Sequence, residues 1–104
     1  MNPVAAVAEA LASLNLGDLG SLRHERVDCA AVLLYLAAST SAPLREVRDA
    51  LRLPQSTTSD LMARMGDRDL VMGYRRGRDV IYGLTPKGHR IVRSAPAYGA
   101  EVPA

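Results

Sequence analysis

The sequence predicts a mainly helical domain with a small β-hairpin. Apolar residues recur at spacings of three and four along much of the first 67 positions, which is the period of amphipathic helices. Between positions 70 and 84 the period changes to two, as expected for strands. The chain has 104 residues, 48% of them apolar, and no Phe or Trp, so one core of Leu, Val, Ala, Met and Tyr is expected.

The first predicted helix begins at Pro3, which is acceptable in a first turn. Its apolar side chains form one stripe with spacings of three, four and three, made by Val4, Val7, Leu11 and Leu14. The segment NLGDLGS then interrupts the helical pattern.

Three further helices are predicted before the period changes. Residues 22–38 form the second helix, which is apolar over a wide arc and should be the most buried. Residues 44–51 form the third, with arginines and acids facing outward. Pro54 then forces a tight turn, and residues 55–67 form the fourth helix.

The hairpin is predicted from residues 70–74 and 80–84, with the arginine-rich segment 75–79 as its loop. Thr85 and Pro86 are typical of a helix start, so a short last helix should run to residue 93. Two short helices joined by a tight turn and followed by a hairpin form a winged helix-turn-helix. We therefore divide the chain into an N-terminal helix (1–20), a winged helix-turn-helix domain (21–93) and a tail (94–104).

Charge is distributed unevenly along the chain. The first 44 residues hold two arginines and four acids, whereas residues 45–93 hold eleven Lys and Arg against six Asp and Glu. A basic half on a small domain indicates a polyanion as partner, and charge alone leaves a merely solvated face as the alternative.

The segment from Leu44 to Val92 resembles the core of MarR-type transcription regulators, with ArsR- and PadR-type regulators as near relatives. The resemblance lies in three motifs and their spacing: LRLPQST at positions 51–57, RDLV at 68–71, and Leu84-Thr85 followed by Gly88. The chain departs from the family in three places. Its wing loop is short, Asp69 stands where a glycine is usual, and Pro54 stands where a capping serine is common.

The resemblance implies a double-stranded DNA partner read by the fourth helix in the major groove. Its outward residues are the expected DNA contacts: Gln55, Ser56, Thr57, Ser59, Asp60 and Arg64. Gln55 could bond adenine, and Arg64 could contact guanine or phosphate. Asp60 could accept from cytosine or could instead hold Arg64 by i,i+4 pairing.

The wing is expected to hold the DNA backbone or minor groove. Arg75, Arg76 and Arg78 suit phosphates and narrow minor grooves, and Gly77 permits the backbone angle of a short turn. Lys87 is expected to add a backbone contact. Tyr74 and Tyr82 are interpreted as core or cross-strand residues rather than base-stacking platforms.

The family also implies a homodimer and an unknown small-molecule effector. We assign the dimer contact to Val4, Val7, Leu11 and Leu14, with packing of this helix on its own domain as the alternative. Repression of transcription is the expected mode, in the cytoplasm and at the nucleoid.

Other classes of function are disfavoured. Cys29 lies in the apolar arc of the second helix and is expected to be a buried, inert thiol. His24 and His89 are too scattered for a metal site, and no catalytic constellation or cofactor motif is evident. No membrane span or signal peptide is expected.

The second hypothesis for the function is a winged helix that binds another protein instead of DNA. The acids Asp60 and Asp67 on the fourth helix would favour this function.

Overall fold

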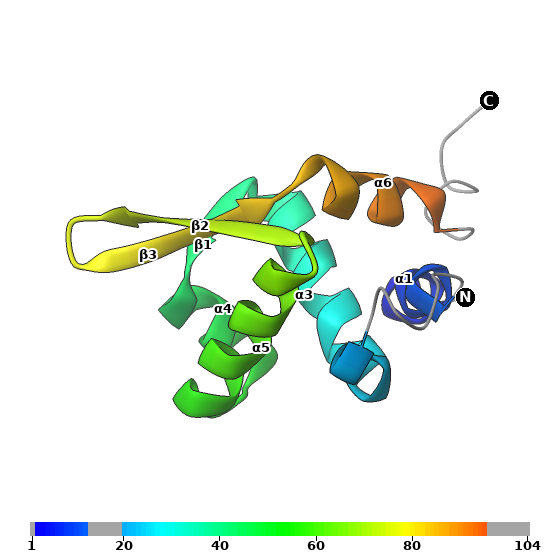
Figure 1. Ribbon diagram of the computed structural model, residues 1–104, viewed down its shortest axis with the longest axis horizontal. Helices are drawn as coiled ribbons and strands as arrows, with labels where there is room; N and C mark the ends of the chain where they lie inside the picture. The colour runs from blue at the N-terminus through cyan, green and yellow to red at the C-terminus, as the bar shows by residue number, and fades with distance from the viewer. Residues whose placement is uncertain (1, 13–19, 96–104) are drawn as a thin grey trace.

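Helix α3 lies at the centre of the molecule, packed against α1, α4 and α6 (Figure 1). The computed structural model describes residues 2–12 and 20–95. The elements are α1 (Pro3–Ala12), η1 (Gly20–Glu25, a 3₁₀-helix), α3 (Arg26–Ser39), β1 (Ser41–Pro43), α4 (Leu44–Leu51), α5 (Gln55–Asp67), β2 (Val71–Arg76), β3 (Asp79–Leu84) and α6 (Pro86–Ser94). The fold is thus mainly helical with a small antiparallel sheet, as the sequence predicts.

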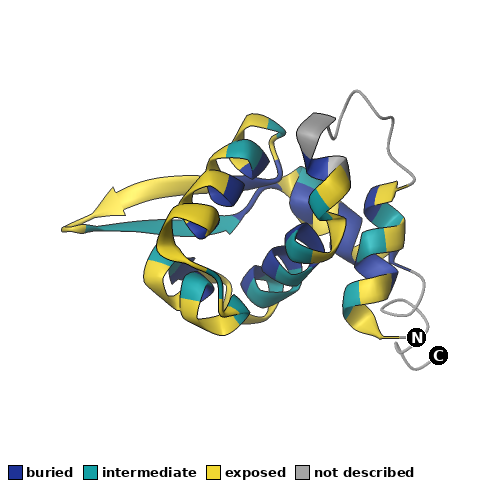
Figure 2. Cartoon of the chain, turned by 90° about the horizontal axis from the view of Figure 1, so that it is seen from below, coloured by how far each residue is buried: buried dark blue, intermediate teal, exposed yellow. Residues whose placement is uncertain are grey.

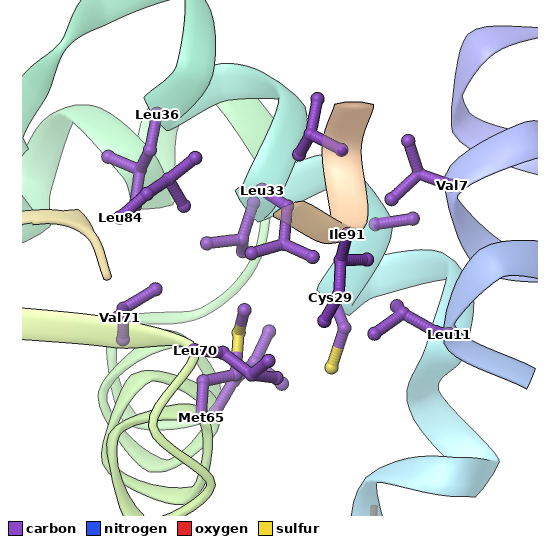
Figure 3. Close-up of a cluster of buried hydrophobic side chains, with 14 of the residues drawn as sticks. Val7, Leu11, Cys29, Leu33, Leu36, Met65, Leu70, Val71, Leu84 and Ile91 are labelled. Atoms are coloured by element: carbon purple, nitrogen blue, oxygen red, sulfur yellow. The ribbon is translucent and has the colours of Figure 1, made fainter. Parts of the chain in front are cut away.

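One hydrophobic core joins the helices to the base of the sheet. Figure 3 shows Val7 of α1 and Ile91 of α6 in one cluster with Leu33 of α3, which also includes Met65 of α5 and Leu70. All of these side chains are buried. The N-terminal helix therefore packs on the same core as the helix-turn-helix.

The second predicted helix is divided in the structure. Residues 20–25 form η1 and the α-helix begins only at Arg26, after Glu25 leaves helical geometry (φ −124°, ψ 30°). The wide apolar arc predicted for this helix is also not buried throughout, because Val27 is 63% exposed. The buried side of α3 carries Cys29, Ala30, Val32, Leu33 and Leu36.

The helix-turn-helix itself follows the prediction, with α4 and α5 at the predicted bounds. Arg52 takes a left-handed conformation (φ 57°) and ends α4. Its backbone N–H donates a hydrogen bond to the carbonyl of Arg48. Pro54 is extended and precedes α5, and its carbonyl accepts a 2.9 Å hydrogen bond from the buried hydroxyl of Thr58. These contacts fix the turn between the two helices.

The sheet has one more strand than predicted. The segment between the second and third predicted helices contains β1, which pairs antiparallel with β3 through Ala42 opposite Tyr82, so the strand order is β1-β3-β2. The predicted five-residue loop is also wrong. The strands continue to Arg76 and from Asp79, which leaves Gly77 and Arg78 as a two-residue turn.

The last helix begins as predicted. Thr85 caps it, its side chain accepting from the Gly88 N–H at 3.0 Å, and Pro86 occupies the first turn. The first helix is described as far as Ala12, so the predicted continuation to Leu14 lies outside the described residues, as does the tail from residue 96. No helix in the described part of the chain is long and apolar enough to cross a membrane.

Candidate nucleic-acid interface

Helix α5 presents a polar outer face, as the sequence predicts. Its inner face is buried and carries Thr58, Leu61, Met62 and Met65. On the other side, the exposed residues of the first two turns are Gln55, Ser56, Thr57, Ser59 and Asp60. The structure therefore brings the predicted contact residues of the first two turns together on one accessible surface.

Gln55, the first residue of α5, is held by a residue of α4. The Nη1 of Arg48 donates to its Oε1 at 2.7 Å, and the Nε of Arg48 donates to Asp49 at 2.9 Å. The side chain of Arg48 is 35% exposed. This bond crosses the turn of the helix-turn-helix and fixes the amide at the N-terminus of α5.

Arg64 is held by two carboxylates. Its guanidinium bonds Asp60, one turn earlier, at 2.9 Å, and Glu25 of η1 at 2.5 Å. Its side chain is only 26% exposed. The hydrogen bond to Glu25 raises the pKa of Arg64, and this effect is larger than the lowering of the pKa by burial. The predicted i,i+4 pairing of Asp60 with Arg64 is confirmed. A DNA phosphate would compete with these two carboxylates for Arg64.

The wing projects away from the helices, and its outer strand is the exposed one. In Figure 2, β2 is exposed over most of its length while β3 is intermediate. Arg75, Arg76 and Arg78 are all exposed, and the ion pairs of residues 2–12 and 20–95 do not involve them. Three cations thus face solvent at the tip without a carboxylate partner in the described chain.

The turn at the tip requires a glycine, as predicted. Gly77 has φ 64°, which matches the first central position of a type II′ turn, the kind that suits the twist of a hairpin. The base of the wing is tied to α4, because Asp79 accepts a hydrogen bond from Arg45. The only acid in the wing therefore pairs with Arg45 and not with the tip arginines.

The two wing tyrosines differ in their surroundings. Tyr82 is partly buried, and its ring lies over Gly73, where an added Cβ would come within 2.9 Å of the ring. Tyr74 is opposite Ile81 in the ladder but is 51% exposed, as is its neighbour Met72 at 52%. The interpretation of both tyrosines as core or cross-strand residues holds for Tyr82, and Tyr74 forms a cross-strand pair on an exposed face.

Lys87 lies beside the end of α5. Its Nζ donates to the carbonyl of Arg68 at 3.1 Å, and Arg68 is the C-cap residue of α5. A cation at this position also interacts favourably with the negative end of the helix dipole. Lys87 thus holds α5 in place, and any DNA contact by its ammonium group would be additional.

The apolar stripe of α1 faces the chain's own core. Val7 and Leu11 are fully buried, against α3 and α6, and Val4 is partly buried. Leu14 lies outside the described residues. The alternative packing on its own domain is therefore what the structure contains, and a dimer contact through this stripe remains a prediction.

Cys29 is buried as predicted. Burial, together with the negative charge of Glu25, raises the pKa of its thiol from 9.0 to about 12. A thiol with such a pKa stays protonated near neutral pH and is a poor nucleophile. Among the residues that the structure describes, no cluster of three or more His, Cys, Asp or Glu side chains could hold a metal ion.

Sequence reasoning did not find the residues that hold this surface in place. Arg45, Arg48 and Glu25 each bind a residue of α5 or the wing, across separations of 34, 7 and 39 positions. The Arg48–Gln55 contact could have been predicted from the sequence, because the two residues lie on either side of the predicted tight turn. The other two pairs join elements whose contact depends on the fold.

Comparisons with known proteins agree with this architecture. No protein-family model matches the chain, and no curated protein matches it in sequence. Solved structures do match. The PcaV transcriptional regulator from Streptomyces coelicolor, in complex with its natural ligand, is 32% identical over 67% of this chain and 52% of its own, with a TM-score of 0.61. The chain thus spans about half the length of PcaV.

Two further structures share the fold at lower identity. A mutant of MarR from E. coli, complexed with operator DNA, is 14% identical over 89% of this chain and 62% of its own, with a TM-score of 0.64. BpsR from Bordetella bronchiseptica, whose DNA binding is regulated by 6-hydroxynicotinic acid, is 20% identical over 95% of this chain and 70% of its own, with a TM-score of 0.62.

Proposed function

We propose that this chain, which has the MarR-type winged-helix fold, is a transcription regulator that binds a specific sequence of double-stranded DNA. The observation that carries the proposal is the presence of two exposed surfaces: the polar N-terminal turns of α5 and the wing arginines, which have no carboxylate partner among the described residues. A recognition helix presents its N-terminal residues to base edges in the major groove. Arginines without a carboxylate partner retain their full attraction for phosphate.

The two surfaces would have different roles in DNA binding. Gln55, Ser56, Thr57, Ser59 and Asp60 would face the bases, and Arg64 would join them in competition with its two carboxylate partners. Arg75, Arg76 and Arg78 would bind the backbone or the minor groove, and Lys87 would add a backbone contact. Phosphate contacts position the protein, whereas base contacts give the sequence preference.

We further propose a homodimer in the cytoplasm that acts as a repressor by occupying a promoter. Two α5 helices would then reach half-sites about one helical turn apart. PcaV was solved in complex with its natural ligand, and the DNA binding of BpsR is regulated by 6-hydroxynicotinic acid. The chain's likeness to both supports an effector for this protein as well. Among the described members of the α1 stripe, Val4 is only partly buried and would be accessible to a second copy.

The salt dependence of DNA binding tests the proposal. Arg76→Ala should weaken binding to duplex DNA and reduce the slope of log affinity against log salt by about one, because one phosphate contact is lost. Arg93→Ala, which removes an exposed arginine from α6, serves as the control and should leave the slope unchanged. The measurement is fluorescence anisotropy across a salt series.

A winged helix that binds only proteins remains the competing function. Its best support was the acidic side chains of α5, but Asp60 is engaged with Arg64 inside the chain. If the purified protein does not bind any duplex from a random pool at low salt, the DNA-binding function is wrong and the protein-binding function takes its place.

A further inference from the structure

The bond between Arg48 and Gln55 constrains what the recognition helix can read. Gln55 is exposed at the first position of α5, where side chains of a recognition helix meet base edges. Its Oε1 lies 2.7 Å from the Nη1 of Arg48, which belongs to α4. The first residue of α5 is therefore positioned by a neighbour that comes from outside the helix.

The chemistry of arginine settles which way the amide faces. A guanidinium group has N–H donors and no acceptor, so the atom of Gln55 that faces Arg48 must be the carbonyl oxygen. The NH₂ group of the amide then points away from Arg48. The accessible groups of the Arg48–Gln55 pair are therefore the two amide N–H donors of Gln55. The positive guanidinium of Arg48 lies against the amide oxygen.

This arrangement disfavours adenine. A glutamine binds adenine through both of its groups, accepting from N6 with the oxygen and donating to N7. Here the oxygen already accepts from Arg48, and the positive guanidinium would repel the N6 amino group. Guanine presents two acceptors in the major groove, O6 and N7, which suit a pair that offers donors and positive charge.

The charged groups around the pair leave this preference in place. Asp49 binds the Nε of Arg48 at 2.9 Å and offsets part of its charge, but it bonds a different nitrogen from the one that holds Gln55. The side chain of Asp49 is 71% exposed, so water screens it. The nitrogen that orients the amide, Nη1 of Arg48, is not the one that Asp49 bonds.

We infer that Arg48 orients Gln55 so that the recognition helix selects guanine, and not adenine, at the base that Gln55 contacts. The inference rests on the proposed DNA-binding function and adds to it a specificity determinant in α4. Arg48 acts through Gln55 and is a positioning residue.

Selection of bound duplexes from a random pool tests this inference, followed by sequencing of the selected sites. Four forms of the full chain are compared: wild type, Gln55→Ala, Arg48→Met and the control Arg93→Met. Gln55→Ala identifies the contacted position, since the base preference should disappear there and nowhere else. Arg48→Met removes the donor and keeps an unbranched side chain, and Arg93→Met removes one exposed charge from α6.

The wild type and the control should select guanine at the position that Gln55→Ala identifies. In Arg48→Met the ratio of guanine to adenine there should fall by about tenfold, which is the discrimination of one good side-chain–base contact. Thermal unfolding of each variant verifies that it is folded.

Two results would overturn the inference while leaving DNA binding intact. The first is selection of adenine by the wild type at the Gln55 position, and the second is an unchanged guanine preference in Arg48→Met. Failure of the wild type to bind any duplex at low salt is a different result, which would refute the proposed function and this inference with it.

Discussion

At the start of α6 the backbone passes so close to the end of the helix-turn-helix that no side chain fits between them. A Cβ at Gly88 would lie 2.3 Å from the carbonyl oxygen of Leu70. Thr85 fixes the approach, because its N–H donates to the same carbonyl at 3.3 Å and its hydroxyl donates to the carbonyl of Asp69. The Thr85 hydroxyl also accepts from the Gly88 N–H. The motif formed by Leu84, Thr85 and Gly88 thus connects the wing to the last helix and fixes how closely the two approach.

Gly88→Ala should therefore lower the free energy of unfolding by about 2–3 kcal/mol, because the backbone must shift to admit the methyl group. Gly66→Ala, in α5, is the matched control: its Cβ would meet only the carbonyl of Val71, at 3.9 Å. The control should be neutral or raise stability by about 0.5–1 kcal/mol, as expected for alanine in a helix. Urea denaturation measures both, and equal effects of the two substitutions would contradict the close approach.

At the scale of elements, ion pairs and hydrogen bonds connect the recognition helix and the wing to the rest of the domain. Arg64 joins α5 to η1, Lys87 joins the end of α5 to α6, and the Arg45–Asp79 pair joins the wing to α4. All of these groups are partly exposed, so each pair contributes modestly to stability. Their main effect is to set the positions of the two surfaces proposed to bind DNA.

Replacing Glu25 by glutamine tests the role of Arg64 in this arrangement. Loss of the carboxylate charge should lower stability by at most about 1 kcal/mol, because both side chains are partly exposed. The guanidinium then becomes more available to phosphate, and one additional contact would steepen the slope of log affinity against log salt by about 0.9. Urea denaturation and anisotropy titrations at several salt concentrations give the two quantities.

Glu9→Gln, which removes an exposed acid from α1, is the control for this experiment. It should change neither stability nor the salt slope. A Glu25→Gln variant that loses stability but keeps the wild-type slope would show that Arg64 serves only to hold α5 on η1.

At the scale of the whole molecule, α1 belongs to the same core as the winged helix. It packs against α3 and α6, although residues 13–19 separate it from η1 along the chain. The described chain has a radius of gyration of 13.1 Å, close to the value expected for one domain of about 100 residues. We expect α1 to unfold together with the rest of the domain.

Leu11→Ala should accordingly lower the free energy of unfolding by about 2–5 kcal/mol, because Leu11 is fully buried within its own chain. Val27→Ala, at a position of α3 that is 63% exposed, should change it by no more than about 0.5 kcal/mol. Thermal unfolding and the mass in solution are measured together. If Leu11→Ala halves the mass and leaves the stability of the monomer unchanged, the α1 stripe is a dimer contact instead.

Much of this architecture is predictable from local sequence signals. Prolines and periodicity placed α4 and α5 at their observed bounds, and Thr85-Pro86 placed the start of α6, because capping and backbone restrictions act within a few residues. The strand β1 was missed, since three residues carry no period and gain their strand character only by pairing with β3. The wing strands were predicted too short, because charged residues such as Arg75 and Arg76 have no local strand signal. They belong to β2 through their pairing with β3.

The sequence by itself determined the winged helix-turn-helix, the polar outer face of α5 and the basic wing tip, because each follows from spacing and residue type along the chain. Only the tertiary structure decided which of the charged groups are engaged. It placed Arg64 on Glu25, Arg45 on Asp79 and Arg48 on Gln55, and it left the three wing arginines without a carboxylate partner among the described residues. The physical reason is that an ion pair or hydrogen bond depends on distance in space, and the fold brings together residues that are far apart in sequence.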